Sequence, residues 1–265
     1  MALSEGVTRR AFLADLGRGA SAIVVLSVVG CGPAGATPLL TGVEPKPATP
    51  DPTARPTPSP GESDPTSGGG HGWHRVNLGF VSAYILAQGG EAAIVDTGVA
   101  GSANDIEAAL TGVGLDWGAV GHVIATHLHG DHIGSLAEVM TRASGATGYA
   151  GAEDLPAMES PRPLQAVADG AEVFGLRIVT SPGHTPGHIC VHDAAAGVLV
   201  AGDALNTSGG RVTGPNPQFT PDMDLANASV AKLAGLSFET LFVGHGDPIE
   251  GGASEQVAAL AAGSG

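Results

Sequence analysis

Short apolar blocks alternate with polar or glycine-rich blocks along the last two thirds of the chain. Apolar runs bounded by such breaks predict strands, and apolar positions three or four residues apart predict helices. The expected strands cover 81–87, 92–95, 122–126, 171–174, 176–180, 189–192, 198–201 and 240–243. The expected helices are one capped by Ser102, and 133–143, 222–236 and 253–262. This order predicts a layered α/β domain with its sheets in the middle.

The first 31 residues have the pattern of an export signal. Arg9 and Arg10 precede an apolar run over 20–29, which is too short for a comfortable membrane span, and Cys31 follows. The arginine pair resembles the twin-arginine signal, and residues 28–31 resemble a bacterial lipobox with valine in place of the usual leucine. We expect an exported protein anchored to the outer face of the cytoplasmic membrane through lipidated Cys31. The alternative is an ordinary cleaved signal whose cysteine is incidental.

Residues 32–72 have a different composition. Ten of the 19 prolines lie there, together with threonine, serine and a run of three glycines. A segment of this kind buries no apolar face, so we expect an extended linker with His71 and His74 solvated at its end. The remaining residues, 73–265, have the length of one domain.

The charge balance argues against one class of partner. The chain carries 11 basic and 26 acidic residues, a formal net charge of −15, and this balance opposes binding to a phosphate backbone. Two cysteines cannot build a disulfide scaffold. We therefore expect a small-molecule substrate, no nucleic acid, and membrane contact only through an anchor at Cys31.

The strongest chemical signal is the heptapeptide 126–132, Thr-His-Leu-His-Gly-Asp-His, at the end of an expected strand. His127 and His129 are two residues apart, so in an extended chain their side chains face the same way. A turn at Gly130 would bring Asp131 and His132 to the same cavity. Imidazole and carboxylate groups together suit zinc, and also iron or manganese.

Four further motifs follow the same order as those of a known family. They are Asp96 in Ile-Val-Asp-Thr-Gly, His184 in Ser-Pro-Gly-His-Thr-Pro-Gly-His, Asp203 in Leu-Val-Ala-Gly-Asp, and His245 in Val-Gly-His-Gly-Asp-Pro. With the histidine cluster, they make the domain resemble the metallo-β-lactamase-fold metallohydrolases. The resemblance implies a four-layered αβ/βα sandwich with its site at one edge of the two sheets.

The resemblance also implies a role for each residue. His127, His129 and His184 would hold a first metal ion, and Asp131, His132 and His245 a second. Asp203 would bridge the two ions, while Asp96 would orient the cluster from behind. Asp131 and His245 are also expected to take part in catalysis. Seven donors exceed the needs of one tetrahedral zinc and suit two ions, whose surplus charge favours a bridging hydroxide as nucleophile.

The motifs rank the reactions of this family without naming a substrate. A bridging Asp203 favours the glyoxalase-II-like branch over β-lactam hydrolysis, but only about 20 residues follow His245, which speaks against a glutathione thioester. The stretch 204–219 lacks the tyrosine that a lactonase often uses. The leading expectation is a dinuclear zinc hydrolase for a small ester, thioester or lactone. The alternatives are a single-iron persulfide-dioxygenase-like enzyme and a non-catalytic metal-binding lipoprotein.

Three other residues carry weaker signals. We expect His188 to be structural rather than a ligand, and Cys190 to be a buried strand residue. Arg211 either contacts an anionic substrate or is simply solvated.

Overall fold

The computed structural model describes residues 72–263. The expected export signal over 1–31, the anchor at Cys31 and nearly all of the expected linker, including His71, lie outside these residues. Within them, every helix is too short or too polar to cross a membrane.

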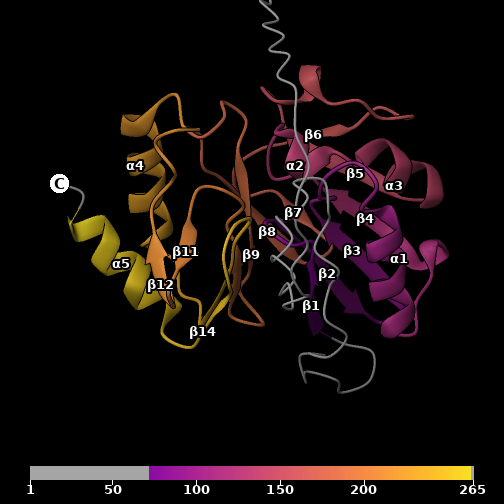
Figure 1. Ribbon diagram of the computed structural model, residues 1–265, viewed down its shortest axis with the longest axis horizontal. Helices are drawn as coiled ribbons and strands as arrows, with labels where there is room; N and C mark the ends of the chain where they lie inside the picture. Colours follow the sequence, from indigo (N-terminus) through magenta and orange to yellow (C-terminus); the bar gives the residue numbers. More distant parts are fainter. Residues whose placement is uncertain (1–71, 264–265) are drawn as a thin grey trace, which may run out of the picture. The chain divides into compact units, whose positions relative to one another are not determined.

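Two six-stranded sheets form the centre of the domain (Figure 1). The first contains, in spatial order, β1 (Gly72–Asn77), β2 (Ser82–Gln88), β3 (Glu91–Val95), β4 (Val120–Ile124), β5 (Thr147–Gly151) and β6 (Gln165–Val167). The second contains β14 (Ile249–Glu250), β13 (Thr240–Phe242), β10 (Val198–Val200), β9 (Ile189–Asp193), β8 (Leu176–Thr180) and β7 (Glu172–Val173). A small hairpin of β11 (Asn206–Ser208) and β12 (Arg211–Thr213) stands apart from both sheets.

Helices cover the outer face of each sheet (Figure 1). On the first sheet these are α1 (Ala103–Gly112) and α3 (Leu136–Arg142), and on the second α4 (Met223–Leu233) and α5 (Ala253–Gly263). Alternating strand residues supply three apolar cores: Ile94 faces the first helical layer, Leu199 the second, and Val95 the space between the sheets. The domain is therefore the expected four-layered αβ/βα sandwich, with the metallo-β-lactamase fold.

The expected helix over 133–143 is wrong in one respect, because it is two helices. A short α2 (Gly130–Ile133) ends before α3 begins. Gly134 lies against the backbone of residues 99 and 100, which leaves no room for a Cβ atom. Ser135 then donates from its hydroxyl to the Val99 carbonyl. The chain therefore bends between α2 and α3. As a result, the direction of the side chains of α2 is independent of the direction of α3.

Other differences concern edges and caps. Ser102 precedes α1 but its side chain makes no capping hydrogen bond, whereas Asp222 caps α4 by accepting from the Leu225 amide. His74 is not a solvated end of the linker, because it lies in β1 opposite Ile85. Two short 3-10 turns, Trp117–Ala119 and Leu155–Ala157, complete the connections.

Candidate metal centre

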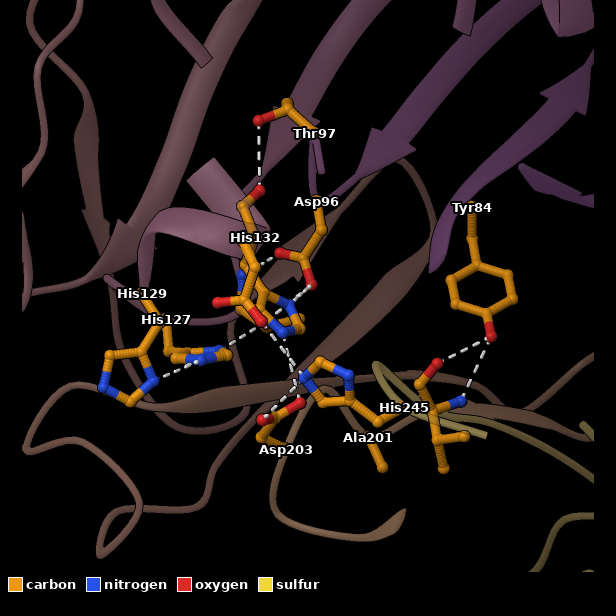
Figure 2. Close-up of polar contacts among 12 residues, drawn as sticks. Tyr84, Asp96, Thr97, His127, His129, His132, Ala201, Asp203 and His245 are labelled. Carbon is orange, nitrogen blue, oxygen red and sulfur yellow. Dashed lines mark hydrogen bonds and ion pairs between the residues drawn. The ribbon is translucent and has the colours of Figure 1, made fainter. Parts of the chain in front are cut away.

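The chemistry-bearing side chains follow the ends of five strands. Asp96 follows β3, the histidine cluster follows β4, His184 follows β8, Asp203 follows β10 and His245 follows β13. β3 and β4 are parallel, as are β10 and β13, and β8 runs with β10 because β9 is antiparallel to both. These strands end at one edge of their sheets, which brings residues far apart in the sequence to one place (Figure 2).

Three histidines form the first group. The Nδ1 atom of His129 lies 3.0 Å from Nε2 of His127 and 2.9 Å from Nε2 of His184. His127 and His184 are buried, with 0% and 2% of their surface exposed. Three ring nitrogens that face each other at this distance have the spacing of ligands around one ion.

The second group contains Asp131, His132 and His245. Nε2 of His245 lies 3.2 Å from a carboxylate oxygen of Asp131. This hydrogen bond lowers the pKa of Asp131, and hydrogen bonds to Asp131 and Asp203 raise the pKa of His245 to about 10. Asp131 and His245 remain 30% exposed at their side chains, so this group faces solvent more than the first.

Asp203 lies between the two groups. Its Oδ1 is 3.2 Å from Nε2 of His132, and its Oδ2 is 3.4 Å from Nε2 of His184 and 3.3 Å from Nε2 of His245. Burial alone would raise the pKa of Asp203, but hydrogen bonds from His132 and His245 outweigh it and hold the pKa well below its usual range. The carboxylate is therefore ionised and faces both groups.

Asp96 supports this arrangement from behind (Figure 2). Its carboxylate accepts from Nδ1 of His132 at 2.7 Å, and from the Thr126 amide and hydroxyl at 2.7 and 2.8 Å. Its φ of 61° lies in the left-handed region, which non-glycine residues rarely adopt. Burial alone would lower the pKa of His132, but Asp96 and Asp203 outweigh it and raise that pKa to about 10.

The outer nitrogens of the other histidines are also held. Nδ1 of His245 donates to the Phe80 carbonyl at 2.8 Å, while Nδ1 of His127 and of His184 lie 3.0 and 3.1 Å from threonine hydroxyls. A proton on Nδ1 leaves Nε2 of a neutral ring with a lone pair that faces inward, and in His245 a bound ion would displace the proton on Nε2. Ligating histidines are commonly oriented through their other ring nitrogen in this way.

The inner atoms fit bound cations. Nε2 of His132 and Oδ1 of Asp203 face each other at 3.2 Å in the buried interior and have no second partner. In the first group, an inner nitrogen is an acceptor when its neutral ring carries the proton on the other nitrogen. Burial lowers the pKa of His127 well below its usual value and that of His184 to about 4, so both rings are neutral. Five imidazoles and two carboxylates suit two divalent ions, although their role as ligands stays a prediction.

Asp154 is a buried residue of this centre that no sequence motif indicates. One carboxylate oxygen accepts from the Leu128 amide at 3.1 Å and from the Thr185 hydroxyl at 2.6 Å, and the other accepts from the Gly187 amide at 2.8 Å. It therefore joins the loop of His127 and His129 to the loop of His184. The residues around Asp154 form no recognisable pattern, so the sequence contains no signal that would have found it.

His188 has the structural position expected of it. Its Nε2 accepts from the Asp203 amide at 3.1 Å, and its Nδ1 lies 2.8 Å from the Ser181 hydroxyl. Ser181 in turn lies 3.1 Å from the thiol of Cys190, which contacts the Ala201 carbonyl. Cys190 is fully buried, as expected, and burial raises the pKa of its thiol to about 12. This series of linked contacts holds the turn between residues 201 and 203.

The first sheet also positions His245, across the gap between the sheets. Tyr84 donates from its hydroxyl to the Val243 carbonyl at 2.8 Å and accepts from the same residue's amide at 3.2 Å (Figure 2). The Ser82 amide donates to the Gly244 carbonyl. Gly244 passes so close to His132 and Asp203 that a Cβ atom would collide with both.

The fold and these two groups define a class of protein that comparison with known families identifies. The model of the metallo-beta-lactamase superfamily matches residues 76–245, so the chain belongs to this superfamily of metallohydrolases.

Individual relatives agree with this assignment. The chain is 30% identical over 196 residues to the uncharacterized protein YobT of Bacillus subtilis (strain 168), a match of 63% of this chain and 83% of that one. It is 37% identical over 172 residues to a hydroxyacylglutathione hydrolase of Acidiphilium cryptum (strain JF-5), which spans 62% of this chain and 63% of that enzyme. A metallo-beta-lactamase family protein of Thermus thermophilus superposes with a TM-score of 0.59 at 25% identity over 73% of this chain and 79% of that one.

Proposed function

We propose that this protein is a dinuclear metal-dependent hydrolase of the glyoxalase-II-like branch, which acts on a small ester, thioester or lactone. One observation carries the proposal: seven potential ligands from separate loops form two groups that meet at Asp203. His127, His129 and His184 would hold one ion, Asp131, His132 and His245 the other, and Asp203 both. The second group exceeds what a single-iron dioxygenase needs, which is why hydrolysis is preferred.

When bound, two divalent ions supply a hydroxide at neutral pH and polarise the scissile carbonyl. Of the proposed ligands, His129, Asp131 and His245 are partly exposed, and we infer that Asp131 and His245, each with 30% of its side chain exposed, meet the substrate. In the metal-free protein the contact with His245 keeps Asp131 ionised, so its carboxylate is available as an oxygen ligand, and beside a bound ion it would orient the nucleophile by accepting a hydrogen bond. Asp96 fixes the direction of His132 throughout.

Zinc is the ion we propose, because imidazole-rich sets with few carboxylates suit zinc, although iron and manganese accept the same donors. The hydroxyacylglutathione hydrolase relative supports hydrolysis of an ester-like bond. Because the chain spans less than two thirds of that enzyme, the relative's own substrate is not carried over.

The test joins metal analysis to a substrate panel. Purified protein is assayed against matched esters, thioesters and lactones, with and without a chelator that is later replaced by zinc. We expect turnover that disappears with the chelator and returns with zinc, and that Asp131→Ala and Asp203→Ala abolish. Full hydrolysis by either variant would refute the assignment. One iron per chain with oxygen uptake would support the dioxygenase, and bound metal without turnover a metal-binding lipoprotein.

We also propose that the protein is exported and anchored through Cys31. The arginine pair, the short apolar run and the lipobox-like residues 28–31 support this proposal. Mass spectrometry of the mature N-terminus provides the test. A diacylated or triacylated Cys31 is expected, and Cys31→Ala should release the protein from the membrane fraction, whereas an unmodified N-terminus elsewhere would contradict anchoring.

A further inference from the structure

A cavity of about 500 Å³ opens beside His245, between the β11/β12 hairpin and the loop that follows it. Hydroxyl and amide side chains of Asn206, Thr207, Thr213 and Asn216 line it, together with Pro215 and Pro217. Two of these polar groups already have backbone partners, since Thr207 donates to the Asp247 carbonyl and Asn206 to the Gly214 carbonyl. Apart from His245, the cavity is lined by uncharged residues.

A basic side chain that contacts the lining of this cavity, Arg75, already has several partners. Arg75 donates to the Ser82 hydroxyl and the Gly246 carbonyl, both at 2.9 Å, and to Asp247 at 3.2 Å. Its charge is matched by the Asp247 carboxylate, and only 18% of its side chain is exposed. Arg75 therefore supports the loop that follows β13 and does not offer a cation to a ligand in the cavity.

Few other cations are available in the described part of the chain. It contains six basic residues against 20 acidic ones. Arg142, Arg162 and Lys232 bind carboxylates or carbonyls elsewhere on the domain, and Arg177 is exposed on β8 opposite Glu172 of β7 and His192 of β9. Arg211 lies at the tip of the hairpin opposite Ser208, whereas Thr213 of the cavity pairs with Asn206 at its open end. Apart from His245, the lining of the cavity therefore offers no side-chain cation to an anionic ligand, and positive charge beside it would come from the proposed metal ions.

Exposed apolar side chains occur at or next to residues of the same centre. Among residues 72–263 the exposed large hydrophobic side chains are Phe80, Phe219 and Leu225. Phe80 stacks on His245 with ring centres 6.0 Å apart. Phe219 precedes Thr220, whose hydroxyl contacts His184. Leu225 lies in the first turn of α4, beside Ala226, which packs against Gly183. Phe80 therefore contacts a proposed metal ligand directly, whereas Phe219 and Leu225 are next in the chain to residues that contact His184 or its neighbour Gly183. Exposed apolar groups at such places are suited to an apolar ligand.

We propose that the site takes an uncharged ester, thioester or lactone with an apolar chain, and that it discriminates against carboxylate-bearing conjugates such as glutathione thioesters. This substrate class rests on the proposed function. The neutral cavity beside His245 receives the polar part of the molecule, and the rim formed by Phe80, Phe219 and Leu225 contacts its apolar chain.

The first experiment measures binding, so that it does not depend on turnover. The zinc-loaded full chain is titrated calorimetrically with two non-hydrolysable thioethers, S-octyl-N-acetylcysteamine and S-octylglutathione. They share the apolar chain and differ in the size and charge of the thiol part, and the cavity variants below test the contribution of charge. We expect the neutral thioether to bind at least tenfold more tightly. Equal or tighter binding of the glutathione thioether, or no binding of either, would overturn the substrate class.

The second experiment measures hydrolysis of the matching thioesters with acetyl, butyryl and octanoyl groups. We expect kcat/KM for the N-acetylcysteamine series to rise with chain length, and Phe219→Ala and Leu225→Ala to reduce the octanoyl-to-acetyl ratio through KM. If kcat/KM did not change with chain length, the result would contradict contact between the apolar rim and the acyl chain. Selective binding of the neutral thioether without any hydrolysis would refute the proposed function, while the preference of the site for an uncharged ligand would stand.

Two variants test the charge argument directly. Thr213→Lys places a cation in the cavity and should narrow the difference between the two thioethers, whereas the control Thr213→Gln, of similar reach but neutral, should not. Arg211→Gln should change neither affinity. A large loss of S-octylglutathione affinity in Arg211→Gln would show that Arg211 binds anions and would overturn the proposal.

Discussion

His188 accepts a hydrogen bond from the backbone amide of Asp203 at 3.1 Å, so a histidine outside both ligand groups supports the carboxylate between them. The ring is completely buried, and burial lowers its pKa to about 3. A neutral imidazole that accepts at Nε2 carries its proton on Nδ1, and it therefore donates to Ser181. This contact orients the turn that presents Asp203.

Replacement of His188 should weaken metal binding without removing a ligand. His188→Ala leaves the buried Asp203 amide without its acceptor, which costs about 1–3 kcal/mol. We expect zinc affinity, measured by competition with a chromophoric chelator, to fall about 10- to 100-fold. His188→Gln retains an acceptor of similar reach and should recover most of the affinity. An equal loss of zinc affinity in both variants would mean that His188 acts through its packing and not through the hydrogen bond that it accepts.

Asp154 should be as important for the first metal group as Asp96 is for His132. Its carboxylate accepts from two loops that carry His127, His129 and His184. Asp154→Ala leaves three donors unpaired, two of them buried, and we expect a loss of unfolding free energy on the order of 3 kcal/mol together with weaker binding of one zinc ion.

The neighbouring Glu153, which is exposed, provides the matched control for Asp154. Glu153→Ala should leave both the denaturation midpoint and the zinc affinity within error of the wild type. An Asp154→Ala protein with an unchanged midpoint and two tightly bound ions would contradict the clamping role.

Gly244 should tolerate no side chain. A Cβ atom there would lie 2.5 Å from Cε1 of His132 and would also collide with Asp203. We expect Gly244→Ala to reduce the metal content measured by inductively coupled plasma mass spectrometry and to lower the thermal midpoint. Gly112→Ala, at the end of α1 where a Cβ meets open space, is the control. Full metal content in Gly244→Ala would show that the close contact of Gly244 with His132 and Asp203 is not needed for metal binding.

The sequence predicted the motifs of the centre because each is local: a strand ends and a polar residue follows it. His127, His184 and His245 could be selected in that way, and the layered fold followed from the alternation of short strands and helices. Asp154, Tyr84 and Arg75 could not be selected, because their partners lie between 7 and 172 residues away and no local pattern encodes those contacts.

The errors in secondary structure have the same origin. β5 was not expected because Gly148 and Gly151 interrupt its apolar pattern, yet its glycines allow Leu164 and the Gly187 backbone to approach closely. The break after Ile133 was not predicted because it depends on Gly134. The backbone of residues 99 and 100 lies too close to this position for a Cβ atom. Tertiary contacts decide these positions.

In the metal-free protein, the free energy of unfolding should depend on pH in the alkaline range. His132 and His245 each have a pKa raised to about 10, above the value of 6.5 for an unfolded histidine. The folded metal-free protein therefore binds more protons than the unfolded chain between pH 6.5 and 10. The stability they contribute is complete below pH 6.5 and is lost as the pH rises through 10.

Chemical denaturation of the chelated protein across this range provides the measurement. We expect the unfolding free energy to decline with pH and the decline to be smaller in Asp96→Asn, which lacks the charge that raises the pKa of His132. Zinc affinity should rise over the same range, because the ion displaces protons. Stability that increases from pH 6.5 to 10 in the chelated protein would contradict this arrangement.

The number of metal ions per chain tests the central claim most directly. Elemental analysis of the zinc-reconstituted protein should give two ions per chain, one in His245→Ala, and fewer than two in Asp203→Ala. One ion or none in the wild type, or two tightly bound ions in Asp203→Ala, would contradict a paired centre bridged by that carboxylate.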